Sequence, residues 1–192
     1  FTFGLGGLTC FPMRFGASTR FFPAPLSPED MMAAIEKYKI TSIYTAPTMY
    51  RLLAELADKY DISSLEKCVS AGETLPKAIW EAFHKATGIR IVDGLGSTEM
   101  IHIFVAASRE DMRPGFTGKA IPGYRAKIVD EDGNDLGPNQ PGLLAVKGPT
   151  GCRYLADDRQ KVYVKDGWNF PGDMYEMNEE GYFRYVARVD DM

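Results

Sequence analysis

The sequence has few residues of the kinds that build metal centres or disulfide frameworks. Only two histidines and three cysteines occur among its 192 residues, and no CxxC pair is present. A zinc site with Cys and His ligands is therefore not expected. We expect Cys10, Cys68 and Cys152 to be buried or inert thiols in a reducing compartment, which indicates a cytoplasmic protein.

Long apolar runs and an excess of positive charge are also missing. No run of 18 or more apolar residues occurs, so we expect no membrane span. The 22 Lys+Arg against 26 Asp+Glu give a formal net charge of -4, whereas a nucleic-acid-binding surface needs positive charge to neutralise phosphates. Neither a membrane nor a nucleic acid is therefore expected as a partner. The composition, 45% hydrophobic and 25% charged, is typical of a folded domain.

Several common catalytic motifs are absent as well. Gly118-Lys119 is followed by Ala120, so the phosphate-binding loop GxxxxGK[ST] does not occur. The glycines at residues 4–7 do not complete GxGxxG, and neither HExxH nor GxSxG is present. A hydrolase with a catalytic triad or a zinc ion therefore has no support.

The first part of the chain alternates between helix and strand patterns. Ser27 is a candidate N-cap followed by Pro28, and an apolar face repeats at Met31, Ile35 and Tyr38. Such alternation favours a parallel sheet flanked by helices, an α/β fold. The patterns predict helices from residue 28 and at residues 49–56 and 75–87, and strands at residues 43–45, 65–70 and 89–93.

From about Arg113 the helical period fades and turn signals recur every 8 to 12 residues or so, a spacing typical of an all-β module. Strand patterns lie at residues 126–129, 143–146 and 182–186. We therefore predict an α/β subdomain at residues 1–112 and a smaller β-rich, barrel-like subdomain at residues 113–192.

Two segments carry side chains suited to chemistry. Residues 93–100 (DGLGSTEM) follow a predicted strand and include the hydroxyl of Thr98 and the carboxylate of Glu99, a hard ligand suited to Mg²⁺. Asp173, after Gly172, could accept two hydrogen bonds from a diol, and Arg188 could pair with a phosphate. Taken singly, each segment is better explained by a structural role, the first as a strand end with an N-cap and the second as a turn aspartate and a solvated charge cluster.

Taken together and in order, these segments resemble the adenylate-forming acyl-CoA synthetase superfamily, and the similarity covers essentially the whole chain. Within that superfamily, the sequence looks like the benzoate-CoA and 2-aminobenzoate-CoA ligase branch. The superfamily motifs lie at residues 70–76 (SAGETLP), 93–99, 172–173 and 188–191, and the branch motifs at residues 3–6 (FGLG), 97–104 (STEMIHIF) and 148–154 (GPTGCRY).

The resemblance implies a binding site for ATP or AMP with Mg²⁺. Thr98 would bond the α-phosphate and Glu99 would hold Mg²⁺, so these two residues would be catalytic. Asp173 would bind the ribose hydroxyls, assisted by Arg188, and Asp190 would be the hinge to a further domain. The adenine would lie between residues Gly72, Glu73 and Thr74 on one side and Asp93, Gly94 and Leu95 on the other.

The resemblance also implies a pocket for an aromatic acid. Phe3 and Ile103 would supply apolar walls, and Gly96 would leave room for the ring edge. His102 would either orient the carboxylate or merely bond nearby backbone, and the sequence favours neither. The pocket residues implied by the resemblance are Thr2, Phe3, Gly96, His102 and Ile103.

By the same resemblance, the chain is part of an enzyme that activates benzoate or 2-aminobenzoate with ATP and transfers the acyl group to coenzyme A. A phosphate loop upstream and a C-terminal domain would be its partners within the longer protein, and we expect little turnover from these 192 residues alone. Two alternatives stay open. One is an adenylating enzyme for another acid, such as a fatty acid, and the other is a non-catalytic module that binds AMP or an aryl acid.

Overall fold

The computed structural model describes residues 2–23 and 25–189. The chain forms two compact units, residues 1–93 and residues 94–192. The predicted hinge residue Asp190 lies outside the described residues.

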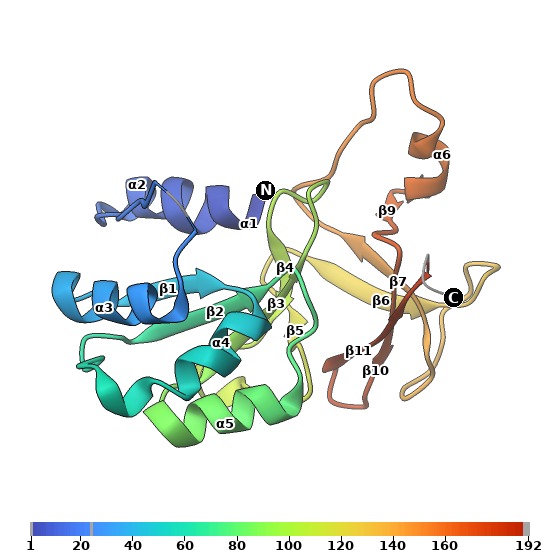
Figure 1. Cartoon of the computed structure of the whole chain (residues 1–192). Helices are drawn as coiled ribbons and strands as arrows, with labels where there is room; N and C mark the ends of the chain where they lie inside the picture. Colours follow the sequence, from blue (N-terminus) through green and yellow to red (C-terminus); the bar gives the residue numbers. More distant parts are fainter. Residues whose placement is uncertain (1, 24, 190–192) are drawn as a thin grey trace. The chain divides into compact units, whose positions relative to one another are not determined.

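The first unit has helices on both faces of a small sheet. Figure 1 shows α1 and α2 on one face of β1 and β2, and α4 and α5 on the other. Helices on both faces bury the strands, as expected for parallel pairing. Its helical elements are α1 (Thr2–Leu5), the π-helix η1 (Gly6–Cys10), α2 (Phe11–Phe15), α3 (Pro28–Tyr38), α4 (Pro47–Ala54), the 3₁₀ helix η2 (Ala57–Lys59) and α5 (Lys77–Thr87), and its strands are β1 (Ser42–Thr45), β2 (Lys67–Ala71) and the first half of β3 (Ile91–Gly96).

Helix α3 begins and ends as its sequence predicts, but its buried face is different. The Ser27 side chain accepts a hydrogen bond from the backbone N–H of Asp30 (3.0 Å) and so caps the first turn. The buried residues are Met32, Ala34 and Ile35. The prediction that Tyr38 lies on the buried apolar face of α3 was wrong.

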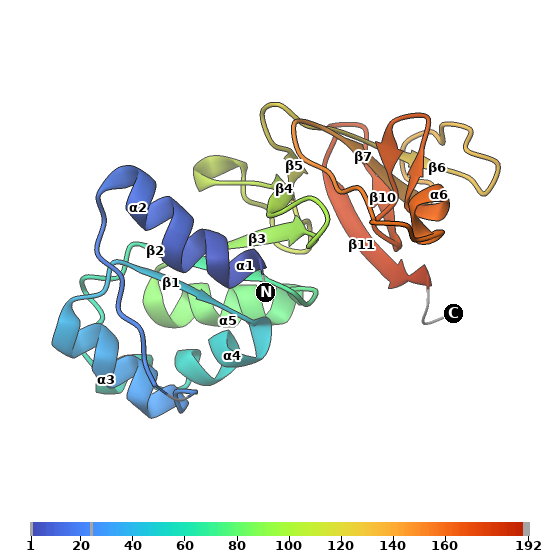
Figure 2. The same cartoon turned by 90° about the horizontal axis from the view of Figure 1, so that it is seen from above.

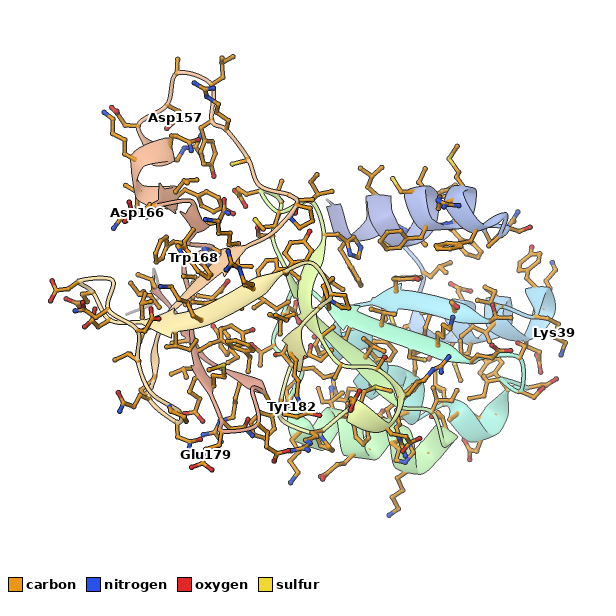
Figure 3. The ribbon with its side chains drawn as sticks, turned by 180° about the vertical axis from the view of Figure 1, so that it is seen from behind. Lys39, Asp157, Asp166, Trp168, Glu179 and Tyr182 are labelled. Atoms are coloured by element: carbon orange, nitrogen blue, oxygen red, sulfur yellow. The ribbon has the colours of Figure 1, made fainter. Side chains whose placement is uncertain are left out.

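Tyr38 is 42% exposed, and its side chain contacts Arg20 at the surface. The guanidinium of Arg20 lies 4.7 Å from the ring centroid and donates a hydrogen bond to the hydroxyl (3.3 Å). At the end of α3, Lys39 (labelled in Figure 3) has a left-handed backbone, and its Nζ lies 2.6 Å from the carboxylate of Asp61.

The strands of the first unit are tied to the helices by buried polar groups. β1 and β2 are parallel, with Ser42 opposite Lys67 and Thr45 opposite Ser70. The hydroxyl of the buried Tyr50 on α4 donates to the carbonyl of Val69 on β2 (3.0 Å). These bonds satisfy polar groups that would be costly to bury alone.

The second unit is built mainly from antiparallel strands. The second half of β3 pairs with β4, which pairs with β5, and the other sheet has the order β11-β10-β7-β9-β8 with β6 paired to β7. Figure 2 shows this sheet with α6 beside it. Its elements are β4 (Ile103–Ala106), the 3₁₀ helix η3 (Arg109–Asp111), β5 (Lys119–Ala120), β6 (Arg125–Val129), β7 (Gly142–Lys147), α6 (Arg159–Tyr163), β8 (Val164–Lys165), β9 (Trp168–Asn169), β10 (Asp173–Met177) and β11 (Phe183–Arg188).

The core of the second unit joins its two groups of strands. Met100, Phe104 and Val105 are fully buried against side chains from the other sheet, such as Leu144 and Phe183. The predicted fold class, an α/β part followed by a β-rich part, is confirmed. The parallel pairing holds for β1 and β2, while β4 and β5 make the first sheet mixed.

Two further expectations concern the state of the cysteine thiols and the absence of a membrane-spanning helix. Cys68 is buried, and burial raises the pKa of its thiol to about 12, which keeps it protonated and unreactive. Cys10 is exposed, so for this residue the expectation of a buried or inert thiol can hold only as an inert one. Among the described residues, none of the helices combines the length and apolar character needed to cross a membrane.

Candidate functional site

The loop between β3 and β4 is anchored by one buried side chain and fixed by polar bonds. Met100 is fully buried in the core of the second unit. Its backbone N–H donates to the hydroxyl of Ser97 (3.1 Å), and its carbonyl accepts from the hydroxyl of Thr150 (2.8 Å). The N–H of Ile101 closes a turn on the carbonyl of Thr98 (3.1 Å). The sequence Ser97–Thr98–Glu99 is thereby held in one conformation.

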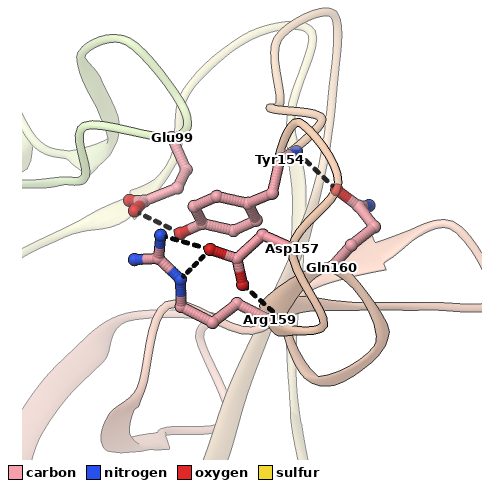
Figure 4. A network of polar contacts seen from close by, with 5 residues as sticks. All are labelled: Glu99, Tyr154, Asp157, Arg159 and Gln160. Carbon is pink, nitrogen blue, oxygen red and sulfur yellow. Dashed lines mark hydrogen bonds and ion pairs between the residues drawn. The ribbon is translucent and has the colours of Figure 1, made fainter.

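This conformation leaves Thr98 exposed and Glu99 half-buried beside it. The hydroxyl of Tyr154 donates to Oε1 of Glu99 at 2.7 Å, and Figure 4 marks this bond with a dashed line. Burial raises the pKa of Glu99, but the Tyr154 bond, a backbone N–H, Ser97 and the charge of Arg188 outweigh it and lower the pKa below its ordinary value. The carboxylate is therefore ionised at neutral pH.

The donor atoms suit a magnesium ion that is bound together with a substrate better than a metal ion that is held by protein side chains alone. Among the described residues, no group of three or more His, Cys, Asp or Glu side chains is placed so that it could hold a metal ion by itself. Mg²⁺ is commonly held by one or two carboxylates together with substrate phosphates. A single ionised Glu99 beside the exposed hydroxyl of Thr98 fits an ion that arrives with a nucleotide.

The same loop contains backbone strain at Ile101. This β-branched residue has φ +73° and a side chain that is 55% exposed. A left-handed conformation costs a residue with a Cβ about 1–2 kcal/mol, and such strain is often stored at functional loops. The strain is a second sign, beside the polar bonds, that the loop conformation is imposed by its surroundings.

Replacing Ile101 by asparagine is expected to stabilise the protein by about 1 kcal/mol, because asparagine tolerates the left-handed region. Urea unfolding measures the change. Leu155→Asn is the matched control, since Leu155 is 95% exposed and has no left-handed backbone. Equal changes in the two variants would show that the gain comes from lost surface hydrophobicity and not from relieved strain.

The residues of β3 have structural roles that the sequence did not reveal. A Cβ on Gly96 would lie 2.5 Å from the carbonyl oxygen of His102, so the return of the chain into β4 requires glycine there whether or not a ring edge lies nearby. Leu95 packs against the core of the second unit. The side chain of Ile103 fills the space that a Cβ on Gly94 would occupy. His102 is half-buried.

Asp173 and Arg188 form a cross-strand ion pair. They are register partners on β10 and β11, and an N–H of Arg188 donates to Oδ1 of Asp173 at 3.0 Å. The side chain of Asp173 is 9% exposed and that of Arg188 is 47% exposed. Burial raises the pKa of Asp173 above its ordinary value, and the positive charge of Arg188 only partly counteracts this.

The remaining predicted residues lie in the first unit. Gly72, Glu73 and Thr74 form an exposed loop between β2 and α5, where Glu73 accepts a hydrogen bond from the hydroxyl of Thr48 (3.4 Å). The ring of Phe3 contacts that of Tyr44 edge to face, with centroids 5.8 Å apart. The last two lie within elements, Thr2 at the start of α1 and Asp93 half-buried in β3.

Within the second unit, the structure brings Glu99 near Arg188 and adds residues that the sequence reasoning missed. Arg188 acts on the charge of Glu99, although the two are far apart in sequence. Tyr154 and Thr150 contact the loop directly. Both lie in the segment 148–154 that supported the resemblance, which was the only signal in the sequence that could have found them.

The chain is similar to known proteins in sequence and in fold. A family model described as "AMP-binding enzyme" matches residues 1–154. The benzoate–CoA ligase of Thauera aromatica is 33% identical over all of this chain, and the acetyl-coenzyme A synthetase of Bacillus subtilis is 36% identical over 94% of it. The crystal structure of the anthranilate CoA ligase AuaEII with anthranoyl-AMP superposes on the whole chain with a TM-score of 0.94 at 38% identity.

The chain spans between 33% and 38% of the length of these proteins. It covers 37% of the benzoate–CoA ligase, 33% of the acetyl-coenzyme A synthetase and 38% of the AuaEII chain. The residues described above therefore correspond to one part of each of these longer proteins.

Proposed function

The chain belongs to the AMP-binding enzyme family, and from this membership we propose that it is part of an ATP-dependent ligase that joins an aryl carboxylic acid to coenzyme A. The observation that carries the proposal is the loop at residues 97–101, which presents an exposed hydroxyl beside an ionised carboxylate. The benzoate–CoA ligase and the anthranilate CoA ligase among its relatives support benzoate or 2-aminobenzoate as the acid.

The proposed reaction has two steps. The carboxylate oxygen of the aryl acid attacks the α-phosphorus of ATP, the bond to the β-phosphate oxygen breaks, and pyrophosphate leaves. The thiolate of coenzyme A then attacks the acyl carbon, and AMP leaves with the carboxyl oxygen it received. Both steps depend on positioned reactants and on groups that balance developing negative charge.

The described residues of the second unit would serve these steps in separate roles. The hydroxyl of Thr98 donates to an α-phosphate oxygen, and Glu99 holds Mg²⁺, which neutralises phosphate charge when bound. Asp173 accepts hydrogen bonds from the ribose hydroxyls, and Arg188 holds Asp173 in place. Gly94 and Leu95 approach the adenine, whereas His102, Gly96 and Ile103 belong to the acid pocket.

The other residues to which we assign roles lie in the first unit. The loop of Gly72, Glu73 and Thr74, with Asp93, would line the adenine, and Thr2 and Phe3 would line the aromatic ring. We further propose that the subdomain boundary lies at residues 112 and 113. A phosphate loop, a C-terminal domain and the hinge at Asp190 would complete the longer enzyme.

Calorimetric titration with a non-hydrolysable benzoyl-adenylate analogue tests the proposal on this chain and on the complete protein. We expect the complete protein to bind the analogue more tightly than AMP or benzoate alone, because the analogue occupies both half-sites at once. Matched titrations with acetyl- and fatty-acyl-adenylate analogues identify the acid. No preference for the aryl analogue in the complete protein would contradict an aryl-acid ligase.

A ligase for another acid is the second candidate, because the acetyl-coenzyme A synthetase is 36% identical to the chain. A non-catalytic binding module is distinguished by a different measurement. Such a module would bind the aryl-adenylate analogue, yet the complete protein would release no pyrophosphate from ATP with any acid in a panel of aryl and aliphatic carboxylates.

A further inference from the structure

We propose that Tyr154 is a positioning residue that holds the carboxylate of Glu99 for a divalent cation. The inference rests on the proposed function, since an ion that arrives with ATP is what Glu99 would bind. It is carried by the 2.7 Å hydrogen bond from the Tyr154 hydroxyl to Oε1 of Glu99, across 55 residues of sequence. This bond fixes the orientation of the carboxylate, whose two oxygens together have about four acceptor positions and so keep capacity for a cation.

The ring of Tyr154 is itself held from several directions. The guanidinium of Arg159 lies 4.6 Å from the ring centroid, and Asp157 fixes that guanidinium by hydrogen bonds of 2.9 and 2.6 Å. The ring of Tyr163 packs edge to face at 5.8 Å. The backbone N–H of Tyr154 donates to Oε1 of Gln160 (2.8 Å), and Figure 4 shows Arg159, Asp157 and Gln160 around Tyr154.

The same segment contacts the loop at two further points. Thr150 donates to the carbonyl of Met100, and the hydroxyl of Tyr163 lies 3.5 Å from that of Ser97. Residues 150–163 therefore contact Glu99 itself as well as Ser97 and Met100 on either side of it. Bonding of this kind around a ligand fixes the orientation of the donor atom, and its loss typically lowers metal affinity about 10–100-fold.

Tyr154→Phe in the complete protein tests the inference, because the variant keeps the ring and its packing and removes only the hydroxyl. The readout is the affinity for Mn²⁺ in the presence of ATP, measured from free Mn²⁺ by electron paramagnetic resonance. We expect the variant to bind Mn²⁺ about tenfold more weakly. ATP affinity in EDTA, measured by calorimetry, should be unchanged, and urea unfolding should confirm an intact fold.

Two further variants separate positioning from general damage. Tyr38→Phe also loses a hydroxyl that is bonded to a charged side chain, and it should leave Mn²⁺ affinity unchanged. In a Glu99→Ala background, Tyr154→Phe should have no added effect, since its partner is gone. Unchanged Mn²⁺ affinity in Tyr154→Phe, or an equal loss in the Glu99→Ala background, would overturn the inference alone. A wild-type protein that binds no Mn²⁺ with ATP would overturn the proposed function as well.

Discussion

Gly118→Ala is expected to destabilise the second unit by about 3 kcal/mol or more, the range of large core disruptions. Gly118 has φ +135°, and a Cβ there would lie 2.1 Å from the carbonyl carbon of Ala106. The backbone cannot move away easily, because the carbonyl of Gly118 accepts from the N–H of Phe183 (2.7 Å) and Thr117 donates back to Phe183 (2.9 Å). Urea unfolding followed by circular dichroism measures the loss.

Gly133→Ala separates the clash from the cost of the left-handed backbone. Gly133 has φ +89°, but nothing lies within 4 Å of a Cβ placed there. This variant is therefore expected to lose only about 1–2 kcal/mol. If the two variants lost the same stability, the close approach of Gly118 to Ala106 would not explain why glycine is required at position 118.

The local elements of the first unit could be predicted because their signals are local. Ser27 and Pro28 mark the start of α3, and the short β-prone run after residue 42 marks β1. By contrast, α1 and α2 were not predicted, since residues 3–7 include three glycines that disfavour a helix. Tyr38 was misplaced because its contact with Arg20 depends on a loop 18 residues away.

The family could be predicted from the order of the motifs, and the family match confirms it. The contacts that shape the loop could not be predicted in the same way. Glu99 contacts Tyr154 and Met100 contacts Thr150 across 55 and 50 residues of sequence, a stretch that includes β4 to β7. The need for glycine at Gly96 likewise arises from the return of the chain at His102. Such long-range contacts leave no periodic pattern in a single sequence.

Asp173→Ala is expected to weaken AMP binding to the complete protein at least tenfold. A hydrogen bond to a charged group contributes about 1.5–3 kcal/mol, and 1.4 kcal/mol corresponds to about tenfold in affinity. The proposed bonds from the ribose hydroxyls to this carboxylate would supply that energy. Calorimetric titration with AMP measures the change, and unchanged affinity would contradict the proposed role of Asp173.

The chain offers a matched control on the same pair of strands. Glu176 on β10 faces Arg184 on β11, beyond the register shift between Met174 and Tyr175, and it is likewise ion-paired. Glu176→Ala should therefore leave AMP affinity unchanged.

Burial raises the pKa of Asp173, so its negative charge opposes folding at pH values above that raised pKa. This loss of stability disappears as the pH falls below the ordinary pKa of an aspartate. Asp173→Asn should therefore be at least as stable as the wild type at pH 7 in urea unfolding while still losing AMP affinity, which separates a ligand-binding carboxylate from a structural one.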